Sequence, residues 1–174
     1  MSNIFIVSDT HWGHTNFLKF TNDKGERIRP FDSVEEVDEL MVDNWNKTVT
    51  DQDIIYHLGD VYVGDGWKHL PRLKGKKRLI LGNHDKLHDQ HLMKYFQKIT
   101  MWRQFPEFNC LLTHVPVHAS TLFKVKFNIH GHVHMNSLAD DRYINACVEV
   151  QNYIPVNIEE IISAHESNWD QDIP

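Results

Sequence analysis

The 174-residue sequence lacks several features, and each absence excludes a class of protein. Its longest apolar runs, such as residues 4–7, fall far short of the roughly 20 residues that span a membrane. No basic stretch followed by a long apolar one opens the chain, so we expect no secretory signal. The only two cysteines, Cys110 and Cys147, lie in apolar stretches. They are typical of core residues in a reduced, cytoplasmic protein and not of a disulfide framework.

Positive charge is also scarce, with 18 Lys and Arg against 24 Asp and Glu, a formal net charge of −6. This balance disfavours stable binding to duplex nucleic acid. Aromatic residues, in contrast, are plentiful, with nine Phe, five Trp and five Tyr, and they exclude a disordered chain. The length suits one core, so we expect a single domain over residues 1–174 with no cap domain.

Hydrophobic patterning predicts an α/β protein with layered sheets and flanking helices. Continuous apolar runs predict strands over residues 3–8, 53–58, 78–81, 108–113, 127–130 and 143–150. Helical spacing predicts helices over residues 33–47, 88–97 and 158–165. Ser33 and Glu36 form a capping-box pattern at the start of the first helix.

Polar side chains of the types that bind metals follow five of the apolar runs. These side chains are Asp9 with His11, Asp60, Asn83 with His84, His114, and His132 with His134. In α/β proteins, bound molecules lie at the carboxyl ends of the strands. We therefore expect these residues to meet at one edge of the sheets, which we call the rim. A glycine precedes Asp60, Asn83 and His132, and we expect it to let the backbone turn sharply there.

The chemistry of the predicted cluster indicates a metal centre. Asp and Asn oxygens with His nitrogens suit Mn, Fe, Zn, Ni or Co, and no cysteine joins them as in a structural zinc site. The ligands outnumber the needs of one metal. They fit two divalent ions about 3.5–4 Å apart with one carboxylate between them.

The same residues resemble the motifs of the calcineurin-like metallophosphoesterase family. The motifs, all present in order, are Asp9-x-His11, Gly59-Asp60, Gly82-Asn83-His84-Asp85, His114, and Gly131-His132-x-His134. Residues 8–14 and 153–157 look like a small single-domain branch from bacteria and phages. The resemblance implies a four-layer α/β/β/α sandwich of two mixed sheets flanked by helices, and a phosphoester hydrolase.

The resemblance also implies roles for individual residues. One metal would be bound by Asp9, His11, Asp60 and His134, and the other by Asp60, Asn83, His114 and His132. A bridging hydroxide, activated by the metals, would attack phosphorus, and His84 would serve as acid or stabilise the transition state. Asp85 is expected to orient His84. Asn83, His84, His14 and Trp12 are candidates for substrate contact, with Trp12 walling the pocket.

Departures from the family pattern favour a phosphodiesterase. Protein phosphatases of this superfamily carry Asp and Arg where this chain has Val63 and Gly64, and without that arginine a dianionic monoester is less well bound. Small or nucleotide-like diesters, 2′,3′-cyclic nucleotides among them, are the expected small-molecule substrates. Three alternatives stay open: a phosphomonoesterase, a non-catalytic metal-binding scaffold, and a nuclease, although the chain has no basic face for DNA. The sequence leaves the native metals, with Mn favoured, and the oligomeric state undecided.

Overall fold

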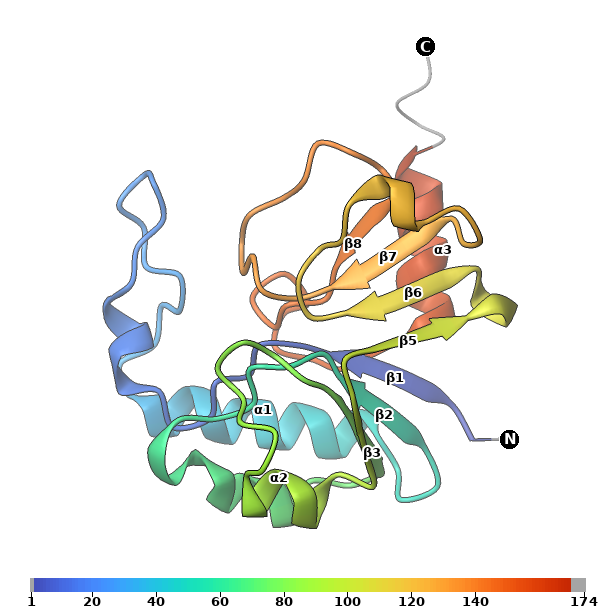
Figure 1. The fold of residues 1–174 in the computed structure, drawn as a ribbon. Coiled ribbons are helices and arrows are strands. Elements are labelled where there is room, and N and C mark those ends of the chain that lie inside the picture. The colour runs from blue at the N-terminus through green and yellow to red at the C-terminus, as the bar shows by residue number, and fades with distance from the viewer. Residues whose placement is uncertain (1, 170–174) are drawn as a thin grey trace.

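The computed structural model describes residues 2–169, which form two mixed β-sheets flanked by helices (Figure 1). The first sheet has the strand order β4-β3-β2-β1-β9, parallel except for β9. Its strands are β1 (Ile4–Val7), β2 (Ile54–His57), β3 (Lys76–Ile80), β4 (Lys98–Thr100) and β9 (Val156–Asn157). The second sheet has the order β5-β6-β7-β8, with β5 antiparallel to β6 and the others parallel. Its strands are β5 (Trp102–Phe105), β6 (Cys110–Thr113), β7 (Phe127–His130) and β8 (Tyr143–Asn145).

Helices α1 (Val34–Thr48) and α2 (Gln90–Tyr95) lie together against one side of the first sheet (Figure 1). In α1 the buried side chains Val37, Met41 and Trp45 recur every four residues, and this stripe packs on the sheet. The predicted cap is confirmed, because Ser33 Oγ accepts a 3.1 Å hydrogen bond from the Glu36 backbone N–H. Glu36 reaches back to the N–H of Asp32, 3.0 Å away.

A second apolar core lies between the two sheets. Ile6 and Ile80 of the first sheet join Leu112 and Ile129 of the second in one buried cluster. Helix α3 (Ile158–Trp169) adds Ile158 to the same cluster and lies beside β7 and β8 (Figure 1). Because alternate residues of a strand face opposite ways, Leu111 and Thr113 of β6 point to the other face of the second sheet.

The remaining elements are short connections. They are the 3₁₀ helices η1 (Thr15–Lys19), η2 (Gly64–Arg72), η3 (Pro106–Phe108) and η4 (Ala119–Thr121). Residues 20–30 form a loop that projects from the rest of the fold and is drawn in blue in Figure 1. An isolated β-bridge joins Thr21 and Arg27 within this loop. Phe20, Thr21 and Ile28 of this loop line a cavity together with His11, which follows β1.

The α/β class with two mixed sheets and flanking helices is confirmed, and each predicted strand and helix exists, with some changes of extent. The strand predicted over 143–150 is wrong beyond Asn145, because the chain enters hydrogen-bonded turns such as Val150 N–H to Cys147 O. The helix predicted to begin at residue 88 starts after Asp89, whose carboxylate caps it through the N–H groups of His91 and Leu92. The short strands β4, β5 and β9 were not predicted.

The two cysteines are free and buried, as predicted. None of the helices within residues 2–169 has the length and apolar character needed to cross a membrane.

Candidate metal centre

The polar residues after the strands meet at one rim, where the carboxyl ends of the parallel strands lie. Strands β1, β2 and β3 are neighbours in the first sheet and deliver Asp9, Asp60 and Asn83. Strands β6 and β7 are neighbours in the second sheet and deliver His114 and His132. The two rims join at a parallel bridge between Ser8 and Cys147.

The backbone at this rim is strained. Five of the candidate ligands adopt the left-handed region with φ between 46° and 71°, a conformation that side chains other than glycine seldom occupy; they are Asp9, His11, Asp60, His132 and His134. Such strain is kept only where the surrounding structure enforces it, and it gathers at functional sites. Here the backbone N–H groups of Asp9 and His11 donate 3.0 Å hydrogen bonds to the carbonyls of Gly59 and Asp60.

Two glycines allow the loops to approach one another closely. A Cβ on Gly82 would lie 2.2 Å from Asp60 Oδ1, and a Cβ on Gly131 would lie 2.2 Å from Asp9 Oδ2. Neither has the positive φ of a sharp left-handed turn, so the expectation of a turn holds only for Gly59, at φ +101°. The other two are needed for space beside the carboxylates.

Asp60 lies at the centre of the cluster. Its Oδ2 atom is 3.7 Å from His11 Nε2 and 3.5 Å from His114 Nε2. Two groups of side chains with the spacing needed for a metal ion share this carboxylate: Asp9, His11 and Asp60, and Asp60, His114 and His132. Within each group the ligand atoms lie within 4.8 Å of one another. One buried carboxylate therefore belongs to both groups.

Asn83 and His134 complete the two groups. Asn83 Oδ1 lies 2.8 Å from His114 Nε2 and 2.9 Å from His132 Nδ1. His134 Nε2 lies 3.9 Å from Asp9 Oδ1 on the other side. Cys147 Sγ lies within 4.8 Å of the ligand atoms of these two residues, so the expectation that no cysteine joins the cluster is wrong. All seven residues expected as ligands are therefore brought together.

The chemistry of these atoms fits a bound cation. Asp9 Oδ1 and both ring nitrogens of His11 are buried and have no hydrogen-bond partner among the described residues. Unpaired buried polar atoms are costly, and a metal ion would satisfy Asp9 Oδ1 and His11 Nε2, which lie 3.8 Å apart. Burial opposes ionisation of Asp9, but the neighbouring imidazoles of His11, His114 and His134 hold the pKa of its carboxyl below the ordinary value. The pKa of Asp60 is likewise lowered, with burial outweighed by His114. Both carboxylates are thus charged at neutral pH.

His84 lies at the open side of this cluster. Its Nε2 is 3.9 Å from Asp60 Oδ2, and 61% of its side chain is exposed. It lines a cavity of about 630 Å³ with His11, His14 and His134, and a second of about 420 Å³ with Tyr62 and Lys86. The imidazole is therefore free to reach a molecule bound at the rim. His14 is placed at the same site, with its ring 5.7 Å from that of His11.

Asp85 has a different environment from the one expected. Its carboxylate accepts three 2.9 Å hydrogen bonds from the backbone N–H groups of Asp60, Val61 and Gly82. Its described hydrogen bonds are all to the backbone and none is to His84. Burial raises the pKa of this carboxyl despite those bonds. Asp85 therefore joins the loops after β2 and β3.

The expected role of Trp12 in the pocket wall is wrong. Its side chain is 0% exposed and belongs to the core beside α1 and the first sheet. It packs against His69, with ring centroids 5.3 Å apart, so it offers no face to a substrate. The backbone at Trp12 is bridged to Tyr62, and this pairing directs the indole away from the rim.

Arg29 and Glu149 form a buried support that sequence patterns did not indicate. The Arg29 guanidinium donates to Glu149 Oε1 at 2.8 Å and to the carbonyls of Thr10 and Asp9 at 2.8 and 2.6 Å. Glu149 Oε2 lies 3.3 Å from His134 Nδ1. Burial opposes ionisation of Glu149, and Arg29 and His134 together keep its pKa low. The two residues are 120 positions apart, and neither lies in a motif.

We expect Arg29→Met to destabilise the metal-free protein by about 3–5 kcal/mol, because it leaves the buried Glu149 carboxylate without its guanidinium partner. Urea unfolding followed by circular dichroism measures this loss. Arg72→Met is the matched control. It breaks an equally close but exposed pair with Glu39, and it should cost about 1 kcal/mol or less. An equal loss of unfolding free energy in the two variants would contradict the conclusion that the buried Arg29–Glu149 pair supports the fold more than the exposed pair does.

The fold and site together define a two-sheet α/β protein with clustered Asp, His and Asn side chains that can hold metal ions. The chain belongs to the same family as the uncharacterized protein MJ1445 of Methanocaldococcus jannaschii. The two are 34% identical over 95% of this chain and 93% of that protein. No family model matches the sequence.

Other similarities are more distant or concern proteins without a stated activity. The Gene 66 protein of Mycobacterium phage L5 is 29% identical over 75% of this chain and 58% of its own length. The structure of a protein of unknown function, AQ665 of Aquifex aeolicus, has a TM-score of 0.76 and 26% identity over 94% of this chain and 100% of its own. A novel archaeal phosphodiesterase reaches a TM-score of 0.49 at 19% identity over 82% of each chain, a likeness too low to bear on activity.

Proposed function

We propose that the protein is a dinuclear-metal-dependent phosphoester hydrolase with a single calcineurin-like metallophosphoesterase domain, acting on small diesters. The observation that carries the proposal is the shared position of Asp60 between the Asp9–His11 group and the His114–His132 group. A lone metal site would not need a buried carboxylate facing both groups. The two free, buried cysteines favour a reducing, cytoplasmic environment.

Two sets of residues would hold the metals. Asp9, His11, Asp60 and His134 supply one set, and Asp60, Asn83, His114 and His132 supply the other. Two divalent cations at such sites would lower the pKa of bound water and offset charge on the phosphoryl oxygens. The oxygen and nitrogen donors accept several metals, and Mn²⁺ is our choice for assays.

His84 supplies the proton in this proposal. Its backbone N–H donates a 2.9 Å hydrogen bond to Asp60 Oδ1, which fixes the loop beside the central carboxylate. The exposed imidazole then points into the opening and can donate a proton to the leaving oxygen of the ester. Such general acid catalysis is typically worth about 10²–10⁴ in rate.

Diesters are favoured over monoesters because the site offers little for a phosphate dianion. The two cavities lined by His84 contain Lys19 and Lys86 but no arginine among the described residues. Arg29 lies behind Asp9 and is fully engaged with Glu149 and two backbone carbonyls. A monoanionic diester needs less compensating charge than a monoester.

We expect the purified protein with Mn²⁺ to hydrolyse bis-p-nitrophenyl phosphate faster than p-nitrophenyl phosphate, for this electrostatic reason. The preference is the ratio of kcat/KM for the two substrates, measured from the release of p-nitrophenolate. The same assay without the metal tests whether turnover depends on Mn²⁺. The opposite preference would contradict the diesterase proposal and favour a phosphomonoesterase. No turnover of any ester by the metal-loaded protein would favour a scaffold.

A further inference from the structure

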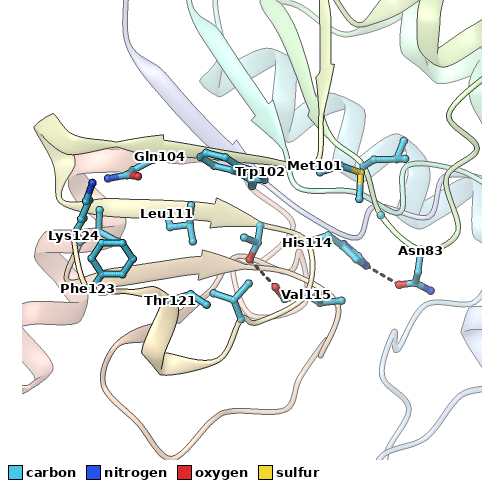
Figure 2. Close-up of a pocket in the computed structure, with 15 residues that line it drawn as sticks. Asn83, Met101, Trp102, Gln104, Leu111, His114, Val115, Thr121, Phe123 and Lys124 are labelled. Atoms are coloured by element: carbon cyan, nitrogen blue, oxygen red, sulfur yellow. Dashed lines mark hydrogen bonds between the residues drawn. The ribbon is translucent and has the colours of Figure 1, made fainter.

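A third cavity lies on the face of the second sheet turned away from the first sheet (Figure 2). Its volume is about 540 Å³, within the roughly 300–1,000 Å³ of small-molecule sites. Its floor is formed by outward-facing residues of β5 and β6: Trp102, Gln104, Leu111 and Thr113. We call this cavity the outer groove.

The segment over residues 115–126 forms the opposite wall of the outer groove, and hydrogen bonds fix it in place. Thr113 Oγ1 donates to the Val115 carbonyl at 2.6 Å, and Tyr143 Oη donates to the Val117 carbonyl at 2.8 Å. Val117 N–H in turn donates to Asn128 Oδ1 at 3.0 Å. The groove is thus held open by a segment tied to β6, β7 and β8.

Large apolar side chains remain exposed around the outer groove. Trp102 is 59% exposed and Phe123 is 79% exposed, and Figure 2 shows them beside Leu111. Exposed apolar side chains gathered around a concave site mark a binding surface more often than scattered ones do. Gln104 and Lys124 provide polar groups at the end away from the rim (Figure 2).

The outer groove is continuous with the candidate metal centre. Asn83 and His114, which would hold one metal, also line one end of the groove, where Figure 2 shows their hydrogen bond. His84, the proposed acid, does not line this groove and lines the two other cavities instead. A leaving oxygen beside His84 and a group in the groove would therefore be on different sides of the phosphate.

We infer that the outer groove binds the retained ester group of a phosphodiester, and that this group is apolar and the size of an aromatic ring. The inference rests on the proposed hydrolase function and adds the substrate class. Hydrolysis forms a bond between water oxygen and phosphorus and breaks the bond to the leaving oxygen, which takes the proton from His84. The retained P–O bond in the groove stays intact, so the products are an alcohol or phenol and an aryl phosphate monoester.

The test varies the retained group and keeps the leaving group constant. Phenyl p-nitrophenyl phosphate and methyl p-nitrophenyl phosphate both release p-nitrophenolate, and each rate is divided by that of the uncatalysed reaction. With Mn²⁺, we expect kcat/KM for the phenyl ester to exceed that for the methyl ester by at least about tenfold. Trp102→Ala and Phe123→Ala should bring this ratio toward one, since both side chains are exposed and their loss leaves the core intact.

Met93→Ala is the matched control, because Met93 is 60% exposed on α2 and lies outside the groove. It should keep the ratio of the unmodified protein. A ratio near one in the unmodified protein, or a ratio unchanged in the Trp102 and Phe123 variants, would overturn the inference.

A binding measurement separates this inference from the proposed hydrolase function. Diphenyl phosphate added to the metal-free protein should shift the amide NMR signals of Leu111 and Val125, which line the groove, and dimethyl phosphate should not. If the protein hydrolyses no ester, these shifts still support the groove as a site for aryl phosphates. The absence of shifts overturns it whatever the turnover.

Discussion

An Asp60→Asn variant is expected to lose both metal ions together and to lose Mn²⁺-dependent turnover with them. In the unmodified protein, Asp60 Oδ2 faces His11 on one side and His114 on the other, so removing the charge of this carboxylate weakens both ligand groups at once. Changes to groups that only support metal ligands already cost about 10–100-fold in affinity. We therefore expect more than about 100-fold weaker Mn²⁺ binding by isothermal titration calorimetry.

The asparagine keeps an oxygen that can accept the His84 backbone N–H, so the loop should remain folded. Urea unfolding of the metal-free variant checks this. Added Mn²⁺ should raise the melting temperature of the unmodified protein but not that of the variant, because only a bound ligand stabilises the folded state. Asp65→Asn, at an exposed side chain on η2, is the control and should retain the shift. Normal Mn²⁺ affinity in the Asp60 variant would contradict its central role.

His84→Ala is expected to keep the metals and lose about 10²–10⁴ in kcat, because the proposed proton donor is removed while the ligands stay. The side chain is mostly exposed and makes no described hydrogen bond, so its loss should leave the fold unchanged. Turnover of bis-p-nitrophenyl phosphate and metal content measured on the same sample separate the two effects.

His88→Ala is the matched control, since His88 is an exposed histidine four residues further along the chain. It should retain full turnover. The loss of kcat in His84→Ala should also be smaller for a substrate with a better leaving group, because a weakly basic leaving oxygen depends less on protonation by a general acid. Full activity of the His84 variant would remove this residue from the mechanism.

Much of the candidate centre was predictable from the sequence because it follows local rules. Buried parallel strands are continuous apolar runs, and the residues after them must lie at one rim. The positions of Asp9, Asp60, Asn83 and His114 follow from these two facts. Short edge strands such as β4 and β5 do not stand out in the sequence because their three or four residues mix polar and apolar side chains and form no apolar run.

The burial of Trp12 shows that a residue next to site residues in the sequence need not lie in the site. Its neighbours His11 and Gly13 lie in the motif, which suggested a place in the pocket. Residues on either side of a tight backbone turn point in different directions, and the bridge to Tyr62 directs the indole into the core. Asp85 differs in a similar way, because its carboxylate bonds to the backbone of the loop after β2 and of Gly82 instead of to the side chain of its neighbour His84.

The α/β class, the order of the strand-end residues and the donor chemistry of the centre can all be predicted from the sequence, since each depends on residues close together in the chain. The residues that support and border that centre become visible only in the three-dimensional fold. The Arg29–Glu149 pair joins residues 120 positions apart. The outer groove combines Asn83, residues of β5 and β6, and the segment over residues 115–126. Such contacts depend on how the two sheets and their loops are placed in space. Local sequence patterns do not predict this placement.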